Sequence, residues 1–179
     1  MRSTILAALT LFLLVVSTAP SLNAQAMMSK PAQDAILKPA DITPALFPDK
    51  VFFRGKTAAS QLRNAAGVKF ADKMYFLAAL VDNSGYSTAI REKYQAYIIT
   101  EVPLEIGGSK LPAGSYGVGF LTGQKFVVMD LGAHEIFTVD TKHDDGMKHA
   151  VPLQIVAGST PGSYLLYNGR DSVEVKRAN

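Results

Sequence analysis

Apolar and polar residues alternate with a period of two along most of the chain after Val51. The run 172–176 alternates valines with Ser, Glu and Lys, and the run 115–120 alternates large apolar residues with Ser and Gly. Such alternation is typical of β-strands that bury one face. Residues of strand character predict five further strands, over 74–81, 125–131, 135–140, 151–157 and 163–167.

The longest alternating run extends from Tyr94 to Ile106 and predicts one long strand. Glu101 and Glu105 share one face of it, about 13 Å apart at the ordinary rise of a strand. The two carboxylates of a glycosidase lie closer together than that. We therefore interpret both glutamates as structural.

Turn residues separate the strand-like runs. The pair Asn168-Gly169 is the strongest hairpin signal, because both residues tolerate positive φ. The segment Leu111–Gly114 places Pro and Gly where a type I turn prefers them. Two more turns are predicted at 122–123 and 145–146.

Frequent turns without a long helical period predict an all-β fold, either an antiparallel β-sandwich or a small β-barrel. Helix is expected in at most two short segments. The first is 57–64, closed by Gly67, and the second is 87–93, capped by Ser87.

The N-terminus has the pattern of a cleavable secretory signal. Arg2 precedes an apolar run over 5–16, and small residues stand at Ala24 and Ala26, where a signal peptidase reads the chain. The run is shorter than the about 20 residues of a membrane span, and no later stretch is longer. We predict a signal peptide over 1–26, a proline-rich extended lead-in over 27–50 and a single β domain over 51–179.

The amino-acid composition limits which cellular compartment and which binding partners are expected. The chain has no cysteine, which excludes disulfides, thiol catalysis and cysteine-based metal sites. An exported domain without disulfides fits a bacterial envelope, so we predict a soluble periplasmic or extracellular protein with no transmembrane span in its mature chain. The 18 Lys and Arg are scattered against 15 Asp and Glu. A nucleic-acid-binding domain usually shows a basic stripe, so no nucleic-acid partner is expected.

The sequence motifs of known catalytic and nucleotide-binding sites do not fit this chain. Gly55-Lys56-Thr57 ends like a phosphate loop, but Lys50 stands where that motif requires its first glycine. Gly117 and Gly119 lie inside a predicted strand rather than before a helix, so a dinucleotide site is excluded. We expect these two glycines to let an aromatic ring or a neighbouring strand approach.

The histidines form the one constellation with metal-binding chemistry. Imidazole together with carboxylate suits zinc, but the spacing from His143 to His149 matches no established motif. The sequence favours a solvated charged turn, so we predict no cofactor and no catalytic residue. The candidate metal ligands that remain are His134, His143, His149 and Asp144.

Two other residue types are candidates for binding. Most of the seven tyrosines fall on apolar faces or beside turns, which indicates packing rather than sugar platforms. The arginines are dispersed, and any one of four is a candidate to line a pocket for an anion: Arg54, Arg63, Arg91 or Arg170.

The segment Leu104–Tyr116, LEIGGSKLPAGSY, resembles a segment of exported bacterial all-β domains of unknown function. Their pattern is I-G-G-x-x-L-P-A-G-x-Y, a strand, a turn and a strand. The resemblance implies an all-β envelope protein and assigns no functional residue.

We expect a non-enzymatic binding or structural module whose partner is an envelope protein, a polymer or a small ligand. One alternative is a carrier of small ligands like the lipocalins, which requires a closed barrel with an unfilled interior. The other is a metal-assisted hydrolase, which requires His134, His143 and His149 to converge.

Overall fold

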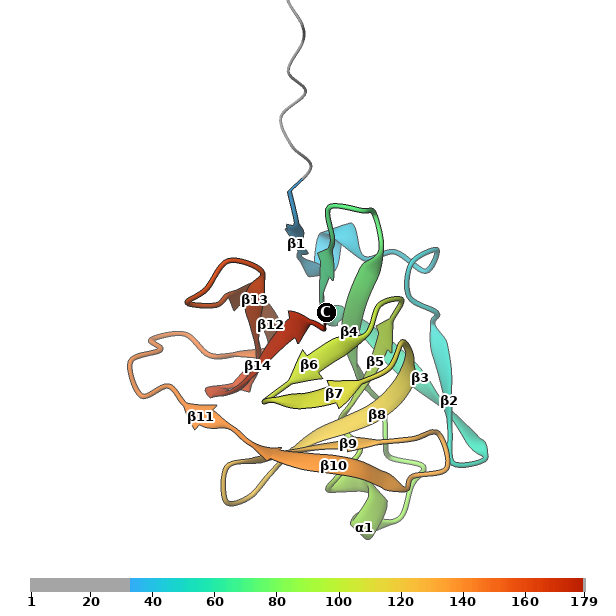
Figure 1. Ribbon diagram of the computed structural model, residues 1–179. Coiled ribbons are helices and arrows are strands. Elements are labelled where there is room, and N and C mark those ends of the chain that lie inside the picture. Colours follow the sequence, from blue (N-terminus) through green and yellow to red (C-terminus); the bar gives the residue numbers. More distant parts are fainter. Residues whose placement is uncertain (1–32, 179) are drawn as a thin grey trace, which may run out of the picture. The chain divides into compact units, whose positions relative to one another are not determined.

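The structure is a computed structural model that describes residues 33–178. The predicted signal peptide and residues 27–32 lie outside this range. The described chain consists mainly of antiparallel strands in two sheets (Figure 1). The first sheet contains β1 (Ala35–Leu37), β2 (Lys50–Phe53), β3 (Lys56–Lys69), β4 (Tyr75–Val81), β5 (Ala96–Thr100), β8 (Gly114–Leu121), β9 (Lys125–Met129) and β10 (Glu135–Asp140). The second contains β6 (Leu104–Ile106), β7 (Ser109–Leu111), β11 (Lys142–His143), β12 (Val151–Ala157), β13 (Ser163–Gly169) and β14 (Asp171–Arg177).

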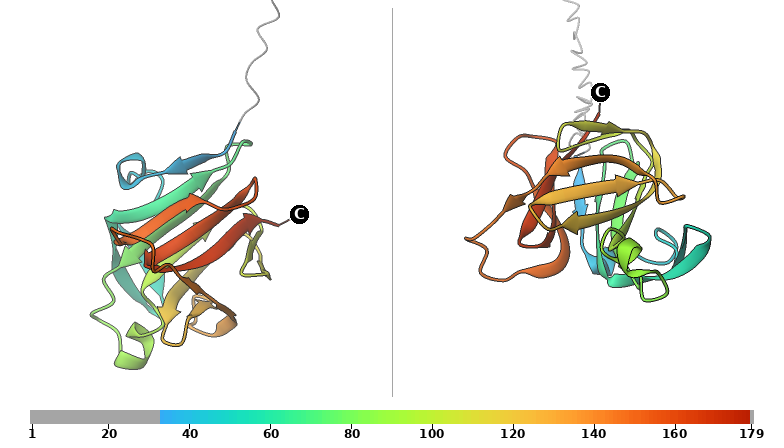
Figure 2. Two further views of the ribbon diagram at one scale, coloured as in Figure 1. Left: turned by 90° about the vertical axis from the view of Figure 1, so that its left-hand side faces the viewer. Right: turned by 90° about the horizontal axis from the view of Figure 1, so that it is seen from below.

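The strand order leaves both sheets open. In the first sheet the order is β1-β3-β4-β5-β8-β9-β10, with β2 paired to the beginning of β3. In the second it is β12-β13-β14-β6-β7, with β11 paired to β14. The left view of Figure 2 shows the orange and red strands β12, β13 and β14 of the second sheet lying over the teal and green strands of the first. The described residues therefore form an all-β sandwich, as predicted, and no closed barrel.

Two hydrophobic cores share the first sheet. The first core lies between the sheets and includes Phe76, Ile98 and Leu166. The second core lies on the opposite face of the first sheet and includes Phe53 and Tyr94. Several strands of the first sheet consequently carry buried residues on both faces, unlike the half-buried strands that the alternating pattern indicates.

The segment 27–50 contributes to this packing where the structure describes it. β1 pairs with the end of β3, and a 3-10 turn, η1 (Pro39–Asp41), follows it. Ile42 and Phe47 are buried in the second core. Within residues 33–178, strand structure therefore begins at Ala35, before the predicted boundary at residue 51.

One of the two predicted helices is wrong. Residues 57–64 lie in β3, where 56–59 pair with β2, and Ser60 and Gln61 pair with β4. Ala, Gln, Leu and Arg favour helix locally, but pairing with neighbouring strands overrides that weak preference. The second helix is confirmed as α1 (Thr88–Arg91) with Ser87 at its N-cap, although the Ser87 side chain makes no capping hydrogen bond.

The single long strand predicted over 94–106 is also wrong. β5 ends at Thr100 in the first sheet, and β6 begins at Leu104 in the second. Pro103 precedes β6, and the Thr100 hydroxyl donates to the carbonyl of Val102 at 2.6 Å in the bend between the strands. Proline favours such a break because it lacks the N–H that a ladder requires.

The hairpin signal at 168–169 is confirmed with a shift of one residue. Asn168 pairs with Asp171, so Gly169 and Arg170 form the two-residue loop, with Gly169 at φ +64°. The turns at 122–123 and 145–146 are confirmed. The segment Leu111–Gly114 links β7 to β8, and therefore connects the two sheets rather than closing a hairpin.

Candidate functional site

The three histidines lie apart. His134 Nδ1 lies 3.0 Å from an Asp130 carboxylate oxygen, and Asp130 also accepts the backbone N–H groups of His134 and Gly132. These hydrogen bonds hold the pKa of Asp130 below its usual range. The pair is therefore a local turn-forming arrangement on the surface.

His143 is held by a different carboxylate. Its Nδ1 lies 2.6 Å from Asp171, while His149 is exposed in the following loop. Asp144 accepts the Tyr167 hydroxyl at 3.3 Å and the Gly146 N–H at 3.0 Å. Within residues 33–178 no three His, Cys, Asp or Glu side chains form a group that could hold a metal ion. The histidines thus do not converge as the hydrolase alternative requires.

The two glutamates lie apart, Glu101 in the bend after β5 and Glu105 in β6. Glu101 accepts the backbone N–H of Tyr75 at 2.9 Å, and Glu105 pairs with Lys176 at 2.8 Å across β6 and β14. This ion pair raises the pKa of Lys176 above its usual value. Both carboxylates are engaged in structural contacts, in agreement with their interpretation from sequence.

The predicted approach of an aromatic ring is confirmed at Gly117, whereas at Gly119 the backbone of the turn after α1 approaches instead of a strand. A Cβ at Gly117 would overlap the ring of Phe53, and a Cβ at Gly119 would overlap the backbone carbonyl of Lys93. Phe53 in turn stacks on Tyr94, with ring centroids 3.9 Å apart. Gly117 is therefore required so that the second core can close against β8. Most tyrosines are core residues too, with Tyr86, Tyr94, Tyr97, Tyr164 and Tyr167 buried.

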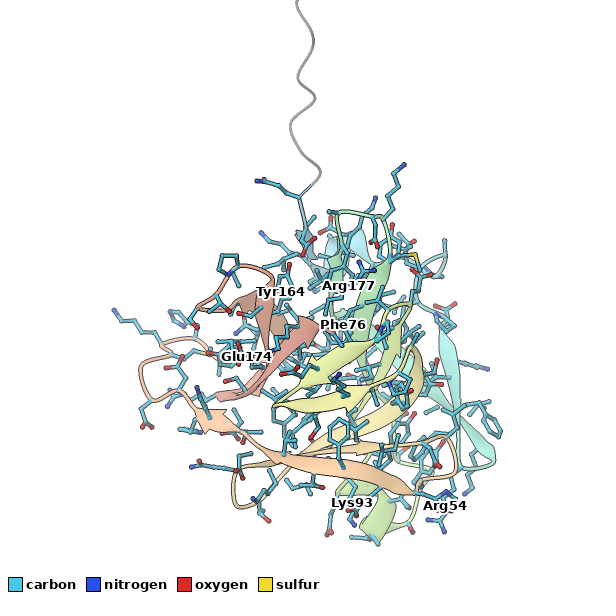
Figure 3. All side chains as sticks on the ribbon, in the orientation of Figure 1. Arg54, Phe76, Lys93, Tyr164, Glu174 and Arg177 are labelled. Carbon is cyan, nitrogen blue, oxygen red and sulfur yellow. The ribbon has the colours of Figure 1, made fainter. Side chains whose placement is uncertain are left out.

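A polar recess near the C-terminus is filled by its own charges. Asp34 accepts the Tyr164 hydroxyl at 2.5 Å and the backbone N–H of Ala71 at 2.8 Å. Arg177 donates to Asp72 at 2.6 Å, and this hydrogen bond lowers the pKa of Asp72. Figure 3 shows Tyr164 and Arg177 in the same part of the molecule. These hydrogen bonds connect the described beginning of the chain to β13 and the β3–β4 turn, so the polar groups of the recess are already engaged.

The strongest candidate site is an apolar groove beside β12, which we call the β12 groove. Its volume is about 450 Å³, within the range of about 300–1,000 Å³ that is usual for ligand sites. It is lined by residues 36–39 around β1, by 63–66 of β3 and by 151–156 of β12. Ile36 and Val151 are 37% and 39% exposed, so apolar surface remains open at its rim.

The wall of the groove opposite β12 is formed by an irregularity in β3. Gln61 pairs with Leu80 and Ala65 with Ala79, so residues 62–64 have no partner on β4. The Asn64 amide donates to the Gln61 side chain at 3.0 Å and closes this bulge. Bulges commonly redirect side chains beside functional sites, and this one places Arg63 and Asn64 in the groove lining.

The charge of the groove has one sign. Its lining includes Lys38 and Arg63 and no acidic residue. Within the described residues Arg63 takes part in no ion pair. The groove therefore combines apolar walls with a cation that is free to meet an acidic group.

Sequence reasoning found the components of this groove but not the site. The run 151–157 was predicted as a strand, and Arg63 was a candidate anion-binding residue. Pro152 is the signal that places β12 at a sheet edge, since proline within a strand is confined to edges and bulges. The bulge at 62–64 carries no such signal, because its residues read locally as helix.

Comparison with known proteins adds no further assignment. A scan against protein-family models and searches of curated proteins and of solved structures found no match to this chain. Among residues 33–178, no helix has the length and apolar character needed to cross a membrane. The site must accordingly be interpreted from its own geometry.

Proposed function

We propose that this chain is an exported binding module that holds an extended peptide segment of a partner protein in the β12 groove. The observation that carries the proposal is the edge of β12, which has no strand partner on one side among residues 33–178 and borders an apolar groove. An added strand gains main-chain hydrogen bonds from such an edge and specificity from side-chain pockets.

The chemistry of the groove defines the peptide. Its apolar walls suit Val, Ile, Leu or Phe side chains, whose burial is worth about 1.5–3 kcal/mol each. Lys38 and Arg63, without a lining carboxylate, favour a segment that carries an acidic side chain or its own terminal carboxylate. Pro152 offers no N–H, so pairing is expected along the later part of β12.

The two alternatives gain less support. A lipocalin-like carrier requires an enclosed interior, whereas the space between the sheets is filled by the side chains of the first core. A metal-assisted hydrolase requires convergent histidines, whereas His134 and His143 pair with separate aspartates. Neither alternative would use the β12 groove as its binding site.

Selection from a library of short random peptides tests the proposal. The enriched peptides should be extended and apolar with an acidic residue, and their binding should slow amide exchange in 151–157. Arg63→Glu should weaken them by about fivefold, since an exposed ion pair is worth at most roughly 1 kcal/mol. The matched control is Lys110→Glu, a cation on β7 outside the groove lining.

Two results would contradict the proposal. One is the failure of any peptide to protect 151–157 from exchange. The other is equal weakening by Arg63→Glu and Lys110→Glu, which would indicate a general charge effect instead of recognition in the groove.

Export is the second part of the proposal. It rests on the signal-like residues 1–26 and on the absence of cysteine. The resemblance of 104–116 to exported bacterial domains agrees with it. Expression of the whole chain in a Gram-negative bacterium should yield a periplasmic or secreted protein whose first residue is Met27, as checked by N-terminal sequencing. Recovery of uncleaved chain from the cytoplasm would contradict export.

A further inference from the structure

A small recess at the tip of the β2–β3 hairpin gathers positive charge. Arg54, Lys56, Tyr86, Ser87 and Ile90 line it, and its volume is about 170 Å³. This is smaller than the about 300 Å³ at the lower end of whole-ligand sites. The recess thus suits a single small group. None of its lining residues is acidic.

The Lys56 side chain is held in place before any ligand arrives. Its ammonium donates to the carbonyl of Gly85 at 2.9 Å and lies 5.9 Å from the centre of the Tyr86 ring. The Tyr86 hydroxyl donates to the carbonyl of Phe53 at 2.9 Å, which fixes the ring against the hairpin. The ammonium keeps two further N–H donors, because Lys carries three.

Arg54 occupies an unfavourable backbone position. Its φ is +47°, and Gly55 follows at +76°. Hairpin turns of this kind prefer Asn at the first of these positions, because a longer side chain is strained there. The Arg54 N–H donates to the carbonyl of Leu131 at 2.7 Å, which holds the turn against the β9–β10 loop.

Both cationic residues line the recess, and its lining contains no acidic residue. Among the described residues neither Arg54 nor Lys56 belongs to an ion pair, in contrast to Lys93, which pairs with Glu135. Figure 3 shows Arg54 at the lower margin of the molecule, far from the Tyr164–Arg177 region. The Ser87 hydroxyl, free of a capping bond, adds a donor to the same recess.

We propose that this recess binds a tetrahedral oxyanion, a phosphate or sulfate group. The Arg54 guanidinium offers paired donors that match two of its oxygens, Lys56 supplies a point charge and Ser87 a neutral donor. An anion here balances the positive charge of the two residues, which gives the strained Arg54 a function. The same chemistry is found in free phosphate and in the headgroup of an anionic lipid.

NMR titration of the mature protein with inorganic phosphate, at constant ionic strength, tests the site. Saturable shifts are expected at the amides of Arg54, Lys56 and Ser87, with a dissociation constant of about 1 mM. Arg54→Asn removes the guanidinium and suits the turn, so it should weaken binding about tenfold while leaving the protein folded. The matched control Lys50→Gln removes a cation from β2 outside the recess and should leave binding unchanged.

Sedimentation with vesicles separates the two sources of phosphate. Vesicles of phosphatidylcholine with phosphatidylglycerol should bring down the wild type and not Arg54→Asn if the group belongs to a lipid. Phosphate shifts without sedimentation would identify the free anion as the ligand. The absence of both effects, or equal effects in Arg54→Asn and wild type, would overturn the proposal.

Discussion

At the scale of single residues, Gly117 shows how a missing side chain shapes the protein. Gly117→Ala should destabilise the fold by about 1–3 kcal/mol, because the added Cβ would overlap the Phe53 ring in the second core. Urea unfolding measures this loss. Gly85→Ala is the control, since nothing lies within 4 Å of the Cβ it would add. Equal unfolding midpoints for the two variants would show that the ring has room.

Tyr94 presents the opposite situation, a buried polar atom that makes no hydrogen bond in the core. Its hydroxyl is buried without a hydrogen-bond partner among the described residues. Tyr94→Phe should therefore stabilise the protein by about 1 kcal/mol, because an unsatisfied buried donor is removed. Chemical unfolding near neutral pH checks this. Tyr75→Phe, at a half-buried position, should change stability by less than about 0.5 kcal/mol.

The same tyrosine predicts a pH dependence. Burial raises the pKa of Tyr94 above its usual value of 10.0. The unfolded chain releases this proton as the pH rises above 10, whereas the folded chain retains it, so stability should fall in that range. The stability that the neutral Tyr94 hydroxyl contributes is fully present below pH 10 and is lost as the pH rises above it. Stability measured up to about pH 11 should fall less steeply in Tyr94→Phe than in wild type.

At the scale of elements, local patterns predicted that a strand exists better than they predicted where it begins and ends. The run 151–157 matches β12 at both ends, because a charged loop precedes its strand-like residues and Gly158 follows them. The break at Pro103 and the strand over 57–64 were missed for different reasons. The alternation of 94–106 continues in phase through the bend, whereas the local preference of 57–64 for helix is overridden by pairing with β2 and β4.

The β13–β14 hairpin gives an element-scale prediction. Gly169 has φ +64° and open space around its Cα. Gly169→Ala should cost about 1 kcal/mol from backbone strain alone, because no neighbour would meet the new methyl group. Gly169→Asn should cost less, since Asn tolerates this conformation. Thermal unfolding compares the two variants, and equal losses would show that strain does not govern the turn.

At the scale of the whole molecule, the sequence could predict an all-β sandwich or barrel but not how the strands are ordered. Alternation reveals which residues of one strand face the same way, and it says nothing about which strands are neighbours. The β12 groove depends on the order of the strands, since β1, β3 and β12 are remote in sequence. The Arg54 recess likewise joins a hairpin tip to the residues around Ser87, so only spatial packing reveals it.

The shared first sheet also predicts how the described domain unfolds. Leu77 is buried in the second core and Leu166 in the first, on different sheets. Leu77→Ala and Leu166→Ala should each cost about 2–5 kcal/mol and shift a single common transition, because both cores rest on the same strands. Hydrogen exchange should be slowest in β4 and β5, at the centre of the first sheet, and faster in the edge strands β10 and β12. Two separate transitions, with Leu77→Ala moving only one of them, would show that the cores fold independently.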